Sequence, residues 1–464
     1  MIDPQMSGGD MLAGLSSGAF TATDLALSLA APLERARRLN ALIPLDIDVS
    51  GQAAAADARR ASGTAGLLDG VPITVKDNIA LDDWPTTGGS PALADYRPAR
   101  GTAIDRLLAA GAIVTAKTNL HELAFGITGA NACTGPARNP FDPKRLAGGS
   151  SSGGAAAVAL GACAIAIGTD TGGSCRVPAA HCGVVGFRPS TYRYAIDGYL
   201  RLSPSRDTLG IMARCIADVA LADSVIAPEH GALPPIAARG LRIGIIRFAP
   251  LDTGVAQAFE HCLDRLQQAG IELVEVDISE AIAADEACGF VIALYETARS
   301  IGTLAREACG MDLTAFAETI ASPDVRALIA SQCGADAVPP EVYAEAVTVH
   351  LPRLRAAYAR ALESVDALAC PTTPLTAPPV DIGETIELGE ARLPVFPAYT
   401  MVTRPDSMAG VPTISLPGGL AGGLPTGFQL TGRAGQDRRL LAIAQCLESI
   451  LPPRPVPPRE KADA

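Results

Sequence analysis

Two serines set among glycines and one lysine are the residues of this sequence whose types could do nucleophilic chemistry. Ser150 lies in the run GGSSSGG, Ser174 ends GTDTGGS, and Lys76 ends the apolar segment GVPITVK. A serine hydroxyl is a weak nucleophile at neutral pH, so Ser174 needs a base, and a lysine can serve only if burial keeps it neutral. Ser150 would relay the proton between them. The three residues together predict acyl transfer.

The glycines of GTDTGGS predict a site for developing negative charge. Glycine opens backbone conformations that are closed to other residues and lets a substrate approach closely. Successive backbone N–H groups could then point into one concavity and stabilise an oxyanion, where a single donor is worth about 3 to 4 kcal/mol. The donors in this segment are Thr171, Gly172, Gly173 and Ser174. Each motif alone is more often a turn, a helix cap or a solvated strand end, so the prediction rests on their joint occurrence.

The order of these motifs resembles the amidase signature family. Lys76 comes first, GGSS begins at Gly148, and GTDTGGS-x-R-x-PA ends at Ala180. The similarity extends from about Gly70 to Arg214 and returns in AGVPTISLP near the C-terminus. The resemblance implies one mixed sheet of many strands wrapped by helices.

The resemblance also implies a Ser-cisSer-Lys triad. Ser174 matches the acylated nucleophile, Ser150 the bridging serine behind a cis peptide bond, and Lys76 the general base. The common GGSSGGS is GGSSSGG here, with changes at Ser152 and Gly154 that leave the triad positions untouched.

Further positions match residues with binding or supporting roles in the family. The resemblance implies an oxyanion hole at the four donors above, and supporting roles for Asp170 and Arg176 beside the nucleophile. It implies that a short segment borders the substrate, for which ordinary core packing is the alternative; the segment is Phe125, Gly126, Ile127 and Thr128.

Composition is consistent with a cytoplasmic enzyme. The net charge of −12, from 37 basic and 49 acidic side chains, argues against a nucleic-acid-binding surface. Eleven cysteines without a C-x-x-C pair indicate reduced thiols. The N-terminus lacks the pattern of a signal peptide, and the long uncharged runs favour buried structure over a membrane span. We expect a small-molecule amide substrate, and neither a nucleic acid nor a membrane as partner. A homodimer is compatible with the sequence.

Neither a metal nor a cofactor is expected. The five histidines have no ligand-like spacing, and His121 is expected to make a structural hydrogen bond. The glycine-rich runs could instead cradle a phosphate, but they lack the Walker lysine and the G-x-G-x-x-G pattern.

Short apolar runs alternate with helical patterns along the chain, which predicts an α/β fold with a central mixed, mostly parallel sheet covered by helices. The expected strands are Val71–Val75, Ala112–Ala116, Ala164–Gly168, Val184–Phe187, Leu241–Ile246, Glu272–Val276, Ala367–Cys370 and Thr413–Leu416. The expected helices include Thr102–Ala110, Gly153–Leu160, Ala213–Ile226 and Val255–Ala269.

We expect residues 1–464 to form a single large domain. Its core would span about 65–220, and a mainly helical insertion at about 279–365, broken at Pro339-Pro340, would shape the pocket. The proline-rich tail at 452–464 is expected to be flexible.

The favoured function is an amidohydrolase that cleaves an aryl or otherwise apolar carboxylic amide through an acyl-enzyme, with esters and carbamates (urethanes) as further substrates. The alternative is the A subunit of a glutamine-dependent tRNA amidotransferase, which shares the signature. Those subunits place an acid several residues upstream of AG-x-P, where this chain has Tyr399–Val402. A third reading, a catalytically dead binding protein, is disfavoured by the intact trio.

Overall fold

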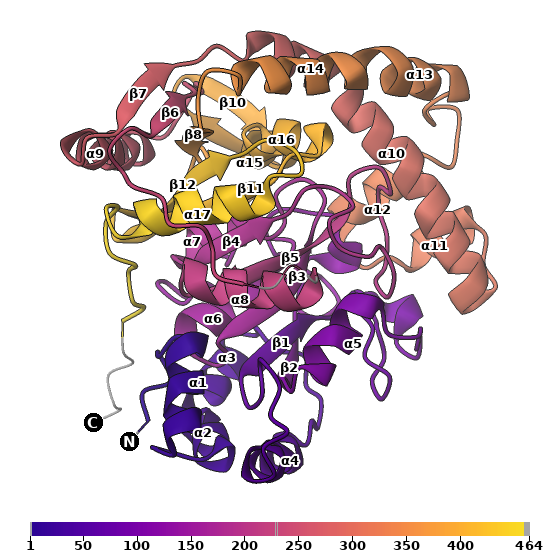
Figure 1. The fold of residues 1–464 in the computed structure, drawn as a ribbon. Coiled ribbons are helices and arrows are strands. Elements are labelled where there is room, and N and C mark those ends of the chain that lie inside the picture. Colours follow the sequence, from indigo (N-terminus) through magenta and orange to yellow (C-terminus); the bar gives the residue numbers. More distant parts are fainter. Residues whose placement is uncertain (1, 228, 230, 459–464) are drawn as a thin grey trace.

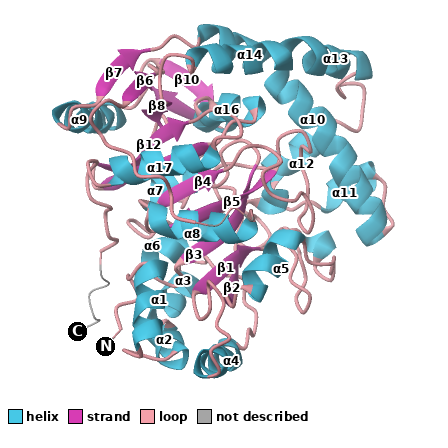
Figure 2. Ribbon diagram, in the orientation of Figure 1, coloured by secondary structure: helices cyan, strands magenta, loops and turns pink. Residues whose placement is uncertain are grey.

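The computed structural model describes residues 2–227, 229 and 231–458, and a ten-stranded sheet runs through its centre (Figures 1 and 2). The strand order is β2-β1-β3-β5-β4-β11-β12-β8-β6-β7. The strands of this sheet are β1 (Pro72–Lys76), β2 (Ile113–Thr118), β3 (Ile165–Asp170), β4 (Val185–Arg188), β5 (Thr208–Ala213), β6 (Arg242–Ile245), β7 (Glu272–Glu275), β8 (Ala367–Pro371), β11 (Thr413–Ala421) and β12 (Leu424–Thr431). The predicted α/β class with a mixed sheet is therefore confirmed.

The prediction that the sheet is mostly parallel is wrong. β1 pairs in parallel with β2 and β3, and β6 pairs in parallel with β7 and β8, but every pair from β3 across to β8 is antiparallel. The sheet is parallel at its two ends, where helices connect successive strands, and antiparallel at its centre. The β11–β12 hairpin and the insertion of β5 between β3 and β4 produce this centre.

Helices cover both faces of the sheet, and the strand side chains alternate between them. Ile165 and Ile167 of β3 belong to the larger hydrophobic cluster, whereas Ala166 packs into a second cluster on the other side. The helices are α1 (Gly8–Ser17), α2 (Ala22–Ser28), α3 (Ala30–Arg38), α4 (Val49–Ala61), α5 (Thr102–Ala109), α6 (Ser152–Leu160), α7 (Arg176–Cys182), α8 (Ile216–Ile226), α9 (Thr253–Gln268), α15 (Val395–Thr400), α16 (Thr403–Ala409) and α17 (Asp437–Glu448), with short 3-10 turns at Pro91–Leu93 and Glu122–Ala124.

The segment 279–365 contains helices only and lies along one side and the top of the molecule in Figure 1. The long helix α10 (Ser279–Cys309) is capped by Gly310, whose φ of 66° lies in the left-handed region. The other helices of the segment are α11 (Leu313–Thr319), α12 (Pro323–Ala330), α13 (Pro340–Glu345) and α14 (Leu351–Ala361), with a π-helical turn at Ala346–His350.

Two smaller features complete the fold. A separate hairpin of β9 (Thr385–Leu388) and β10 (Ala391–Pro394) leads into α15. Residues 452–458 form no helix or strand, and Arg454 donates to Gln5; the rest of the predicted flexible tail, 459–464, lies outside the described residues. Within the described part of the chain, no helix is both long and apolar enough to cross a membrane.

A buried ion network joins the ends of two central strands. Asp170 ends β3, Arg188 ends β4, and Arg176 begins α7; all three side chains are fully buried. Arg176 donates to both carboxylate oxygens of Asp170, at 3.0 and 3.1 Å, and Arg188 donates to the backbone carbonyl of Asp170. Burial alone would raise the pKa of the Asp170 carboxyl, but the two guanidinium groups hold that pKa below its usual range. Asp170 is therefore charged and indispensable to its partners.

We expect Asp170→Ala to destabilise the protein by about 3 to 5 kcal/mol, because it removes the buried carboxylate that Arg176 and Arg188 share. The matched control is Glu34→Ala, which breaks an exposed pair with Arg37 and should cost about 1 kcal/mol or less. Urea unfolding followed by circular dichroism measures both. Equal losses of stability in the two variants would contradict the structural role given to Asp170.

Candidate active site

Lys76 is the last residue of β1, and its position between β2 and β3 buries its side chain completely. Its Nζ lies 2.8 Å from Ser150 Oγ and 2.9 Å from Thr169 Oγ1. Asn78 also donates to Thr169 Oγ1, at 3.1 Å, so hydroxyl and amide groups surround the amine. Burial lowers the pKa of Lys76 to about 7, which makes a large neutral fraction available at physiological pH.

A second buried lysine on the adjacent strand shows what sets Lys76 apart. Lys117 of β2 is equally buried, but its Nζ lies 2.7 Å from Asp77 Oδ1. Burial lowers the pKa of Lys117 as well, and the Asp77 carboxylate opposes that shift. Lys76 has two hydroxyl oxygens at 2.8 and 2.9 Å in place of a carboxylate. The partner, and not the depth of burial, therefore distinguishes a structural lysine from one suited to act as a base.

Ser150 lies in the turn that leads into α6, and its hydroxyl lies beside the amine of Lys76 at the end of β1. The Gly149–Ser150 peptide bond is cis, as the resemblance implied. His121 donates its backbone N–H to Ser150 O at 3.1 Å, and Ser151 donates its backbone N–H to Ser174 O at 3.0 Å. The second bond holds the two serine-bearing segments side by side.

Ser174 lies in the turn between β3 and α7, which is built around Gly173. Gly173 has a φ of 125°, and a Cβ there would come within 2.3 Å of Thr403 Oγ1, so only glycine fits. Two side-chain bonds fix the flanks of this turn: Thr403 donates to Gly172 O at 2.7 Å, and Thr171 donates to Asp207 Oδ1 at 2.6 Å. Ser174 is thus positioned by both a backbone conformation and its neighbours.

The four predicted oxyanion donors do not all face the same way. Thr171, Gly172 and Ser174 line a pocket, whereas Gly173 donates its N–H to Asp170 Oδ1 at 2.9 Å and is not part of the lining. The carboxylate that anchors Arg176 also captures this N–H. Gly173 therefore departs from the expected donor geometry.

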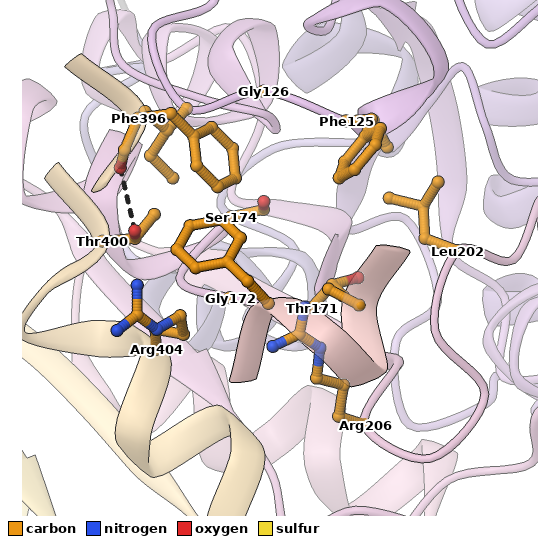
Figure 3. Close-up of a pocket in the computed structure, with 14 residues that line it drawn as sticks. Phe125, Gly126, Thr171, Gly172, Ser174, Leu202, Arg206, Phe396, Thr400 and Arg404 are labelled. Atoms are coloured by element: carbon orange, nitrogen blue, oxygen red, sulfur yellow. Dashed lines mark hydrogen bonds between the residues drawn. The ribbon is translucent and has the colours of Figure 1, made fainter. Parts of the chain in front are cut away.

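A pocket at Ser174 is lined by fourteen residues (Figure 3). Phe125, Gly126 and Ile127 are among them, whereas Thr128 is buried behind the wall, where it contacts His121 Nδ1 at 3.5 Å. The lining residues that sequence reasoning missed are Ala124, Leu202, Arg206, Phe290, Ala293, Phe396, Thr400 and Arg404.

Three phenylalanines form the aromatic part of the pocket lining. Phe396 meets Phe125 edge-on at 6.3 Å between ring centroids and lies 5.9 Å from Phe290. Phe290 comes from α10 and Phe396 from α15, so the helical segment and the C-terminal part each contribute one ring. Such an aromatic wall suits a flat apolar group.

His121 lies beside this pocket but does not line it. Its Nε2 lies 3.0 Å from Asp324 Oδ2 at the start of α12, and Gly126 packs against the ring so closely that a Cβ would lie 2.2 Å from Nε2. The residue links the loop at 121–128 to the helical segment. Among the described residues, no group of three or more His, Cys, Asp or Glu side chains is placed to hold a metal ion.

Known proteins resemble this chain over nearly its whole length. Indoleacetamide hydrolase of Agrobacterium vitis is 39% identical over 441 residues, which cover 93% of this chain and 94% of that protein. Mandelamide hydrolase of Pseudomonas putida is 38% identical, covering 86% and 81%. A glutamyl-tRNA(Gln) amidotransferase subunit from an Anaeromyxobacter species is 35% identical, covering 96% of each chain.

A solved structure shows the same fold. A crystal structure described as that of an amidase superposes with a TM-score of 0.86 at 34% identity, covering 96% of this chain and all of the other. The Amidase family matches residues 28–441, the range that holds the lysine, both serines and the glycine-rich turn. The chain is therefore a member of the amidase signature family, a hydrolase family of the Ser-Ser-Lys type.

Proposed function

We propose that this amidohydrolase cleaves its substrate through an acyl-enzyme on Ser174, with Ser150 as proton relay and Lys76 as general base. One observation carries the proposal. The Nζ of a fully buried lysine lies 2.8 Å from the hydroxyl of a serine, and that serine's segment is hydrogen-bonded to the backbone of Ser174. A neutral amine at this distance can accept the serine proton.

The reaction would proceed in two halves. Ser174 Oγ attacks the amide carbon as its proton passes to Ser150 Oγ, whose own proton passes to neutral Lys76. The protons then return through Ser150 to the leaving nitrogen, the C–N bond breaks, and ammonia or an amine departs from the ester on Ser174. Water, deprotonated along the same route, hydrolyses the ester to the carboxylic acid and restores the serine.

Backbone N–H groups of Thr171, Gly172 and Ser174 are the proposed oxyanion donors, because these residues line the pocket at the nucleophile. The N–H of Gly173 would join them only if it left Asp170. Each donor is worth about 3 to 4 kcal/mol in a site of this kind.

An aryl or otherwise apolar amide is the proposed substrate. Phe125, Phe290 and Phe396 supply the aromatic wall, and Phe125, Gly126 and Ile127 come from the segment expected to border the substrate. The names of the related indoleacetamide and mandelamide hydrolases support an arylacetic amide. Esters and carbamates can undergo the same attack and are proposed as further substrates. A cytoplasmic location and a homodimer stay predictions.

The alternative is a glutamine-dependent amidotransferase subunit, and the pocket bears on it in two ways. Two arginines, Arg206 and Arg404, could receive a carboxylate. The fourteen lining residues include no Asp or Glu for the α-ammonium group, however. From the stretch Tyr399–Val402, where the amidotransferase subunits have an acid, the pocket is lined by Thr400. Leaving a buried ammonium unpaired costs several kcal/mol, so the hydrolase is favoured.

We expect kcat/KM for phenylacetamide to rise about tenfold per pH unit below pH 7 and to level off above it, because Lys76, with a pKa of about 7, must be neutral to accept a proton. Lys76→Ala should lose about 10²- to 10⁴-fold on amides and less on an activated ester, whose leaving group needs little protonation. Lys144→Ala, which removes an exposed lysine, is the control. If Lys76→Ala shows the same pH profile of kcat/KM as the wild type, Lys76 is not the general base.

We also expect the isolated chain to hydrolyse phenylacetamide at least on the order of 100-fold more efficiently than glutamine, without ATP, metal or a second protein. The measurement compares kcat/KM for phenylacetamide, an anilide, a phenyl carbamate and glutamine. If glutamine is the best of the four, or if activity requires an added partner protein, the amidotransferase reading is the correct one.

A further inference from the structure

Arg206 is a buried cation that lines the active-site pocket, and no described carboxylate hydrogen-bonds to its side chain. It is 5% exposed, and its one side-chain hydrogen bond among the described residues goes from Nη1 to Met408 Sδ at 3.7 Å. Its Nε is buried without a partner. A guanidinium stays protonated and carries five donors, so this side chain is greatly under-satisfied in the absence of a ligand.

The acidic groups nearest to Arg206 are bonded to other groups. Asp285 accepts from Arg404 Nε at 2.6 Å. Asp207 accepts from Thr171 Oγ1 and from the backbone N–H groups of Leu202 and Ser203. Glu296 accepts from Ser203, Ser205 and Tyr343. None of them makes a direct hydrogen bond to the Arg206 side chain.

Arg404 differs from Arg206 because its charge is already matched. Besides its bond to Asp285, its guanidinium lies 4.7 Å from the centroid of the Phe290 ring. Figure 3 shows both guanidinium groups on the same side of the pocket, below Ser174 and the phenylalanine rings in that view. Asp285, Asp207 and Glu296 offset the charges of the two arginines at longer range, but the hydrogen-bond donors of Arg206 are left almost without partners.

The backbone of Arg206 is held by the same network that holds the nucleophile. Arg188, which donates to the carbonyl of Asp170, also donates from Nη2 to the carbonyl of Arg206 at 2.7 Å. Arg206 N donates to Ser203 O at 2.9 Å, and the next residue, Asp207, holds Thr171. The backbone of Arg206 is therefore fixed relative to the glycine-rich turn, which places the root of its side chain beside the pocket.

We propose that Arg206 is a specificity-determining residue that binds a carboxylate on the acyl group of the substrate. A carboxylate matches the planar fork of a guanidinium and can accept from the donors that are left without a partner. The proposal rests on the proposed function, because the leaving group of a primary amide is ammonia and everything else that fills the pocket then belongs to the acyl group. The preferred substrates are aryl amides that carry a carboxylate on the ring. Glutamine also has a carboxylate, but its ammonium finds no carboxylate in the lining.

The test measures kcat/KM for phenylacetamide and for its ortho, meta and para ring-carboxylated analogues, with the hydroxylated analogues alongside. We expect the best carboxylated isomer to exceed phenylacetamide at least tenfold in the wild type. In Arg206→Met this ratio should fall to about one or below, and in Arg206→Lys it should be intermediate. Because both substrates are measured on the same variant, a general loss of folded enzyme cancels from the ratio. Arg37→Met, which removes an exposed arginine, should keep the wild-type ratio.

The outcomes separate this inference from the function on which it rests. Hydrolysis of phenylacetamide with no preference for any carboxylated isomer would overturn the inference alone, and so would an equal preference for hydroxylated isomers. If no amide is turned over, thermal stabilisation of Ser174→Ala by the carboxylated amides reads binding directly. Stabilisation that disappears in Ser174→Ala/Arg206→Met supports the carboxylate site; no stabilisation, or stabilisation that survives in the double variant, overturns it.

Discussion

The charged carboxylate of Asp170 holds together the elements on which the active site is built. It lies at the end of β3, binds Arg176 at the start of α7, and accepts backbone N–H groups from Gly173 and Cys175 on either side of Ser174. Arg188 extends the network to the end of β4 and to the carbonyl of Arg206. The glycine-rich turn that carries Ser174, the centre of the sheet and the backbone of Arg206 at the pocket are thus positioned by one buried network. Because it is buried, its geometry is insulated from solvent and salt.

A second constraint is the difference between two lysines on neighbouring strands. Both are buried at the same end of the sheet, and the register places Val75 opposite Lys117 and Lys76 opposite Thr118. Lys117 has a carboxylate partner, Asp77, at 2.7 Å, and this contact opposes the fall of the Lys117 pKa that burial causes. Lys76 faces Ser150 and Thr169 instead, and desolvation then lowers its pKa into the range where it can exchange protons. The fold thus sets the chemistry of each lysine through its nearest partner.

The positions that could be predicted from the sequence are those that a local pattern marks. Lys76 at a strand end, the turn after Gly149 and the turn at Gly173 could be read because glycine and apolar runs mark such positions. The expected strands also begin within about two residues of the observed ones. The strands β5 and β12 of the central sheet were missed, as was the β9–β10 hairpin, and the helix predicted from Ala213 begins at Ile216. The runs of β5 and β12 are buried on both faces, so they have no periodicity to separate them from a helix.

The far wall of the pocket could not be predicted in the same way. Phe290, Phe396 and Arg404 come from α10, α15 and α16, and only the tertiary structure brings them to the loop that holds Arg206. No local pattern distinguishes a phenylalanine on a pocket wall from one in the core. Gly173 illustrates a different limit, since sequence suggested a donor but could not show that Asp170 takes its N–H.

The central claim is that Ser174 carries the acyl group, and trapping that intermediate tests it most directly. Wild-type protein and Ser174→Ala, both verified as folded by circular dichroism, are quenched in acid during turnover of a slow aryl ester or amide. The digests are then read by mass spectrometry. The account predicts an acyl adduct on Ser174 in the wild type and none in the variant. An adduct on Ser150 or Ser152, or an adduct that persists in Ser174→Ala, would contradict it.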